Sequence, residues 1–150
     1  ILTGFLFHPD KVRPLFFLSA KLLGLGGILK TGPAGGLIDR SRDAMLGHME
    51  TINKALKESG GPWILGEQFS LADISLASIY LRLDETGWFD WFMGQSDLNA
   101  IAAHYAQLKA RPSWQKAIEE KQLDIVKSGR KRLLTLVQNS PAIRKKLYGS

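Results

Sequence analysis

The chain of 150 residues contains no cysteine. Disulfides, thiolate zinc sites and cysteine nucleophiles are therefore excluded within it. The absence is compatible with a reducing compartment, and we expect a cytoplasmic protein. Long hydrophobic runs are also lacking: the longest, residues 15–29, is interrupted by Lys21 and by glycine and serine. A membrane-spanning helix needs about 20 consecutive apolar residues, so this run predicts a helix of a soluble domain.

Acidic residues are scarce near the C-terminus. Between Lys121 and Ser150 there are eight lysines or arginines and one acid, Asp124, whereas the whole chain carries a formal charge of +6. The basic character therefore belongs to the last 30 residues, and the rest is close to neutral. We read residues 126–150 as a basic helical tail whose charges form solvated helix faces, and we do not expect nucleic acid or an anionic membrane surface as a partner.

Helical periodicity dominates the remaining sequence, and no run alternates as a strand would. Hydrophobic residues make up 45% and charged residues 23%, which is an ordinary balance for a folded domain. The patterns predict helices over about 11–25, 39–58, 71–84, 97–111 and 112–125, a short helix or compact loop within 86–95, and a last helical segment near 130–138. We predict a loop over 30–36, which is rich in glycine and proline. The prediction is one all-α domain over residues 1–150, a bundle of six or seven helices.

Two local features organise the middle of the chain. Ser70 and Asp73 have the spacing of a capping box, in which each side chain accepts from the other residue's backbone amide. Phe69 and Ile74 flank the cap as a hydrophobic staple. The helix that follows Ser70 is apolar on almost every side as far as Arg82, so we expect it to lie in the middle of the bundle. We therefore assign Phe69, Ser70, Asp73 and Ile74 a structural role.

The context of this cap resembles a known family. Residues 63–74, WILGEQFSLADI, resemble the signature that begins the buried sixth helix of the glutathione transferase C-terminal domain. Residues 105–114, with Tyr105, Leu108, Arg111, Pro112 and Trp114, resemble that family's next helix junction. Residues 75–78, 81–83 and 87–88, together with the basic C-terminal segment, look most like the branch of ganglioside-induced differentiation-associated proteins.

The resemblance implies a partner that this chain lacks. Members of the family have an N-terminal thioredoxin-like domain that binds glutathione, the co-substrate, and supplies the residue that stabilises its thiolate. The helical domain lines a second, apolar substrate pocket, and the proteins are commonly homodimers. On this basis Arg13, Phe16, Phe17 and Lys21 are candidates to face that pocket, although plain packing is the favoured interpretation of the two phenylalanines. No cofactor is expected in the chain itself.

Other candidate sites are weaker. His8, His48 and His104 are scattered, with no acidic partner at the spacing of metal ligands or of an acid–base pair, so we assign neither catalytic nor metal-binding residues. The resemblance predicts the helical, substrate-side domain of a glutathione transferase-like protein, inactive by itself. The alternative is a non-catalytic interaction module of the same shape. The sequence does not identify the electrophile, the role of the tail or the oligomeric state.

Overall fold

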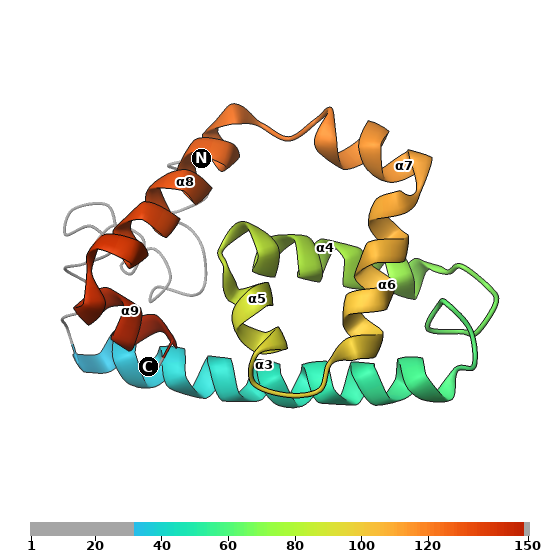
Figure 1. Cartoon of the computed structure of the whole chain (residues 1–150), viewed down its shortest axis with the longest axis horizontal. Coiled ribbons are helices and arrows are strands. Elements are labelled where there is room, and N and C mark those ends of the chain that lie inside the picture. Colours follow the sequence, from blue (N-terminus) through green and yellow to red (C-terminus); the bar gives the residue numbers. More distant parts are fainter. Residues whose placement is uncertain (1–31, 149–150) are drawn as a thin grey trace, which may run out of the picture. The chain divides into compact units, whose positions relative to one another are not determined.

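The computed structural model describes residues 32–148 (Figure 1). Its described residues form seven α-helices and no sheet, which confirms the all-α prediction. The helices are α3 (Gly32–Glu58), α4 (Leu71–Glu85), α5 (Trp88–Met93), α6 (Asn99–Ala110), α7 (Pro112–Trp114), α8 (Asp124–Asn139) and α9 (Pro141–Tyr148), with a π-helical turn at Gln115–Glu119 after α7. The helix predicted for residues 11–25 lies outside the described residues.

The chain divides into two compact units. Residues 42–140 form the larger unit, which holds most of α3 and all of α4 to α8. The described residues of the smaller unit are 32–41 and 141–148, the start of α3 and the whole of α9. Within 32–148, none of the helices combines the length and the hydropathy that crossing a bilayer requires.

The core of the larger unit is built from the stripes that periodicity predicts. Met49 and Leu56 of α3 are buried, and Met45 and Ile52 pack against the same cluster, as expected from their spacing of three and four. The other buried members come from α4, α5, α6, the residue just before α6, and α7: Tyr80, Phe89, Phe92, Leu98, Ile101, Tyr105, Leu108 and Trp114. Ala102, next to Ile101 on α6, is exposed and does not belong to this core.

Three helix boundaries differ from the prediction. Residues 32–36, predicted as loop, are the first turns of α3. Pro33 is compatible with this start because a first-turn residue has no intrahelical partner for its missing N–H. The helix predicted to run from Pro112 to Ile125 is interrupted after Glu119, and a new helix begins at Asp124. The helical segment predicted near 130–138 begins earlier, at Asp124, and extended Ser140 separates α8 from α9.

The placement of α4 is confirmed for one side only. Its side toward Asp73 and Tyr80 is buried, and the helix contacts α5, α6 and α8. Its opposite side is exposed: Leu71 is 80%, Ile74 50% and Ile79 39% exposed. Residues 32–148 therefore do not surround this helix, and within that part of the chain one apolar face of α4 has no cover.

Candidate functional site

The substrate-pocket candidates Arg13, Phe16, Phe17 and Lys21 lie outside the described residues, as does His8. Their assignment stays a prediction. His48 is exposed on α3. The search for a site therefore turns to the polar side chains that the larger unit buries.

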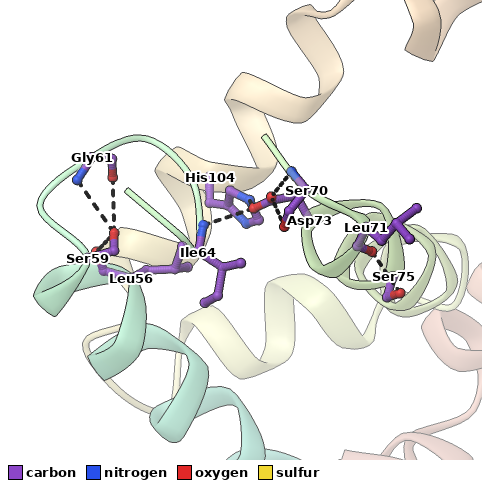
Figure 2. A network of polar contacts seen from close by, with 9 residues as sticks. All are labelled: Leu56, Ser59, Gly61, Ile64, Ser70, Leu71, Asp73, Ser75 and His104. Carbon is purple, nitrogen blue, oxygen red and sulfur yellow. Dashed lines mark hydrogen bonds and ion pairs between the residues drawn. The ribbon is translucent and has the colours of Figure 1, made fainter. Parts of the chain in front are cut away.

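Asp73 is the centre of the most buried polar network (Figure 2). Its carboxylate accepts hydrogen bonds from the Ser70 amide at 2.7 Å and from the Ser70 hydroxyl at 2.8 Å. It also accepts from the Ile64 amide at 2.9 Å and contacts the His104 ring at 3.0 Å. The bond from the Asp73 amide to the Ser70 hydroxyl, the second half of the predicted capping box, stays a prediction.

The sequence brings these groups together by ending α3 abruptly. The turn after α3 uses Gly60 and Gly66, both with positive φ, and a paired backbone contact in which the amides of Trp63 and Gly66 each donate to the other residue's carbonyl at 3.0 Å. Gly61 has no room for a side chain, since an added Cβ would lie 2.4 Å from the Gly66 carbonyl carbon. This tight turn delivers the Ile64 amide to Asp73 at the start of α4 (Figure 2).

The charge state of the network follows from its surroundings. Burial raises the pKa of Asp73, but the hydrogen bonds from Ile64, Ser70 and His104 outweigh it, and the net pKa is lowered. Burial lowers the pKa of His104, and the hydrogen bond and charge of Asp73 oppose that effect only in part. At neutral pH the pair is therefore an ionised carboxylate and a neutral imidazole, with Nε2–H donating to Asp73.

His104 is enclosed by aromatic rings. The rings of Tyr80 and Trp63 meet it edge-on, with centroids 5.8 Å and 5.9 Å away. Its Nδ1 atom is buried and has no hydrogen-bond partner among the described residues. The His104 side chain is 1% exposed, and its contact with Asp73 holds α6 against the start of α4, so we interpret the pair as structural.

A small cavity of about 170 Å³ borders this network. It is lined by Leu56, Gly61, Pro62, Ala100, Ala103, His104 and Gln107. Ligand sites usually enclose about 300–1,000 Å³, so this cavity suits a few water molecules and not the apolar electrophile of a transferase. Within residues 32–148, no three acidic or histidine side chains gather as metal ligands would.

Arg111 connects the two sequence motifs, residues 63–74 and 105–114, through contacts with aromatic rings. Its guanidinium lies 3.6 Å from the ring centre of Phe69 and 5.3 Å from that of Trp63. Phe69 in turn meets Trp63 edge-on at 4.9 Å, while Ile74 is half exposed. Phe69 thus packs on Trp63 and Arg111, and its stapling to Ile74 stays a prediction.

Sequence reasoning missed a second long-range polar contact. Asn53 of α3 accepts from the amides of Ala100 and Ile101 at 3.0 and 3.2 Å, and donates to the Asp97 carbonyl at 2.9 Å. The Asp97 carboxylate accepts from the Asn99 amide at 3.4 Å and pairs with Lys57 at 3.0 Å. The buried Asn53 performs most of the capping of α6.

The open face of α4 has unusual chemistry. Besides Leu71, Ile74 and Ile79 it carries Ser75 and Ser78, whose hydroxyls donate to the carbonyls of Leu71 and Ser75 at 3.0 and 2.7 Å. The hydroxyls are thus engaged by the helix's own backbone. No charged residue lies on this face before Arg82, so a smooth, weakly polar surface runs along more than two turns.

Comparison with known proteins gives one match. Residues 36–107 match the family model described as Glutathione S-transferase, C-terminal domain, which supports a glutathione transferase C-terminal domain in this part of the chain. The matched stretch includes the turn, the Asp73 network and most of α6. Comparisons with curated proteins and with solved structures gave no match.

Proposed function

We propose that this chain is the helical, substrate-side domain of a glutathione transferase-like protein, in which an N-terminal thioredoxin-like domain binds glutathione. In that protein the glutathione thiolate attacks an apolar electrophile, a carbon–sulfur bond forms and the leaving group departs. The family match over residues 36–107 supports the domain type. The possible place in the branch of ganglioside-induced differentiation-associated proteins belongs to the proposal as well.

The observation that carries the two-domain proposal is the open face of α4. Three large apolar side chains, Leu71, Ile74 and Ile79, are exposed on a helix whose other side is anchored by buried Asp73. Burying apolar surface contributes about 25 cal/mol per Å², so an uncovered stripe of this kind favours a packed neighbour. We assign the thioredoxin-like domain as that neighbour.

The chemistry would be divided between the domains. We assign the residue that ionises the glutathione thiol to the thioredoxin-like domain, and we assign a structural role to the buried His104 of this chain. Arg13, Phe16, Phe17 and Lys21 remain our candidates for the apolar pocket, with the two cations suited to the carboxylates of glutathione. The chain by itself should therefore fold but not catalyse.

Conjugation of glutathione to a chlorinated aromatic tests the proposal. The full-length protein should conjugate, and the 150-residue chain should show no rate above the uncatalysed reaction. Within the full-length protein Phe16→Ala should raise KM for the electrophile more than it changes kcat. Failure of the full-length protein both to bind immobilised glutathione and to conjugate would contradict the proposal.

The role of the α4 face is tested separately by Leu71→Asp. Leu71 is exposed and lies in the first turn of α4, where an acid is compatible with the helix dipole, so the chain should still fold. The variant should lose association with the thioredoxin-like domain, measured by titration calorimetry of the two separate domains. Leu123→Asp is the matched control, because Leu123 is also highly exposed, at 67%, and lies just before α8. Equal binding by both variants would remove the α4 face from the interface.

The second candidate function is a non-catalytic interaction module with the same fold, and the same open face favours it. It predicts that the chain alone forms a defined oligomer, whereas a substrate-side domain without its partner stays monomeric. Sedimentation velocity of wild type and Leu71→Asp separates the two: an oligomer that the substitution dissociates favours the module.

A further inference from the structure

The outer face of α8 combines cations and hydroxyls in one compact group. Ser128, Lys131, Arg132 and Thr135 are related by three or four residues, so each is a neighbour of the next on the helix surface, about 5–6 Å apart. All four are exposed. With Leu136 and Asn139 they line a surface depression of about 480 Å³.

The opposite side of α8 fixes this orientation. Arg130 pairs with Asp84 of α4 at 3.2 Å, and Gln122, just before α8, donates to Glu85 at 2.6 Å. Val137 is buried on the same side as Arg130, seven residues away. The group of Ser128, Lys131, Arg132 and Thr135 is therefore held away from α4, because the inner side of α8 is already engaged.

No acid among the described residues pairs with the cations of this face. Lys57 and Arg82 of the larger unit form ion pairs with Asp97 and Glu85, and Arg130 on the inner side of α8 pairs with Asp84. In the described part of the chain, neither Lys131 nor Arg132 forms an ion pair. No acid follows Asp124 in the sequence, so α8 itself offers these two cations no acidic neighbour three or four residues away.

From this arrangement we propose that the outer face of α8 binds a phosphate group, with Lys131 and Arg132 contacting its oxygens and Thr135 and Asn139 adding hydrogen bonds. Arginine presents a planar fork to phosphate oxygens, lysine a compact charge, and neutral donors complete the shell. Leu136, partly exposed at the edge of the depression, offers an apolar contact to the body of the ligand. A phosphorylated small molecule and a phosphomonoester lipid headgroup share this chemistry.

The test compares two variants of the full chain with equal change in charge. Lys131→Gln/Arg132→Gln removes both cations of the group, whereas Lys116→Gln/Lys121→Gln removes two exposed cations outside α8. Glutamine preserves side-chain length and helix propensity. Binding of pyrophosphate is followed by the shifts of backbone amide resonances over residues 128–139, and circular dichroism checks that both variants are folded.

The site and a soluble ligand would be supported if the shifts saturate in wild type and the affinity for pyrophosphate falls at least tenfold in the α8 variant. In the control variant the affinity should fall less than twofold. Binding restricted to vesicles of phosphatidylcholine containing a phosphomonoester lipid, and absent from vesicles of equal charge containing phosphatidylserine, would support the lipid source. Equal weakening in both variants means attraction by net charge alone, and overturns the proposal, as does the absence of binding to both probes.

Thr135→Val is a second variant that keeps the proposal testable if the double variant does not fold. It removes one hydroxyl without changing charge or shape, and should weaken pyrophosphate binding about three- to tenfold. An unchanged affinity would show that this hydroxyl is not part of the site and would overturn the proposed ligand shell.

Discussion

Replacing Asp73 by alanine should destabilise the fold more than any other single loss of an acid in the described chain. The carboxylate is fully buried and accepts from Ile64, Ser70 and His104 at 2.7–3.0 Å. Alanine leaves the two amides and the His104 ring without an acceptor, and each buried donor left unpaired costs about 1–3 kcal/mol. The Ser70 hydroxyl can turn elsewhere, and the amides are only partly buried.

Taking the low end of that range for each of the two amides and the high end for His104, we expect Asp73→Ala to lower the free energy of unfolding by roughly 5 kcal/mol. In a domain of this size that corresponds to a fall in Tm of about 15 °C. Asp73→Asn keeps the shape and one acceptor, so its loss should be about half. Urea denaturation followed by tryptophan fluorescence and circular dichroism measures both.

The matched control is Asp97→Ala. Asp97 also lies near a helix start and contacts a backbone amide, but it is exposed and its cap is largely supplied by Asn53. Its urea midpoint should stay close to that of wild type. A midpoint for Asp73→Ala as close to wild type as that of Asp97→Ala would refute the role that we assign to the buried network.

Three further substitutions, one of them with a matched control, test the same part of the fold. His104→Gln should flatten the pH dependence of stability. The folded pKa of His104 lies below its ordinary 6.5, so the stability of the wild type is complete above pH 6.5 and falls below it, by at most about 1.4 kcal/mol per pH unit. An equal change in the free energy of unfolding between pH 7.5 and 5.5 for wild type and variant would contradict this. Asn53→Ala should cost about 2–3 kcal/mol, because two amides at the start of α6 and a carbonyl lose their partner, and loss of amide-exchange protection confined to that helix end is the specific readout. Gly61→Ala should destabilise the fold strongly, because the new methyl group would clash with the backbone of Gly66. Its control Gly47→Ala, where nothing lies within contact distance on α3, should stabilise the fold by about 1 kcal/mol. Similar changes in Tm for the two variants would show that the turn can rearrange to accept the methyl group.

The parts of the fold that the sequence predicted correctly depend on neighbours along the chain. The spacing of Met49 and Leu56 marks a helix face whatever lies opposite, and Pro112 ends the preceding helix because of its own ring. The end of α3 at Glu58 agrees with the prediction. Its start does not, because Pro33 and the neighbouring glycines were predicted as a loop and instead form the beginning of the helix. Whether a glycine-rich segment starts a helix depends on tertiary packing, and local helix propensity gives no information about that packing.

The contacts that sequence reasoning missed join residues far apart. Asp73 and His104 are separated by 31 positions, and Asn53 and Ala100 by 47. The sequence did contain one indication of these contacts. Asn53 lies four residues after Met49 and His104 three residues after Ile101, so each is a polar residue on an apolar helix face. A polar side chain on a buried face needs a partner, so these positions predict a buried hydrogen bond even though the sequence does not name the partner.

The exposed face of α4 shows a different limit of prediction from sequence. An apolar helix is normally covered, and the composition of α4 led us to place it in the centre of the bundle. Composition does not say which residues provide the cover. The described residues bury the side that carries Asp73 and Tyr80 and leave Leu71 and Ile74 exposed.

The residues that identify the domain are thus those that assemble it. The Asp73 network ties the turn after α3 to α4 and α6, and Arg111 stacks on Phe69 where the second motif meets the first. A substitution of Asp73 should act through the fraction of folded protein, because Asp73 and its partner His104 are both buried. In the full-length protein, Asp73→Asn should therefore lower measured activity only in proportion to the folded fraction, with KM for glutathione and for the electrophile unchanged. A raised KM at full folding would instead place this network in contact with the substrate pocket.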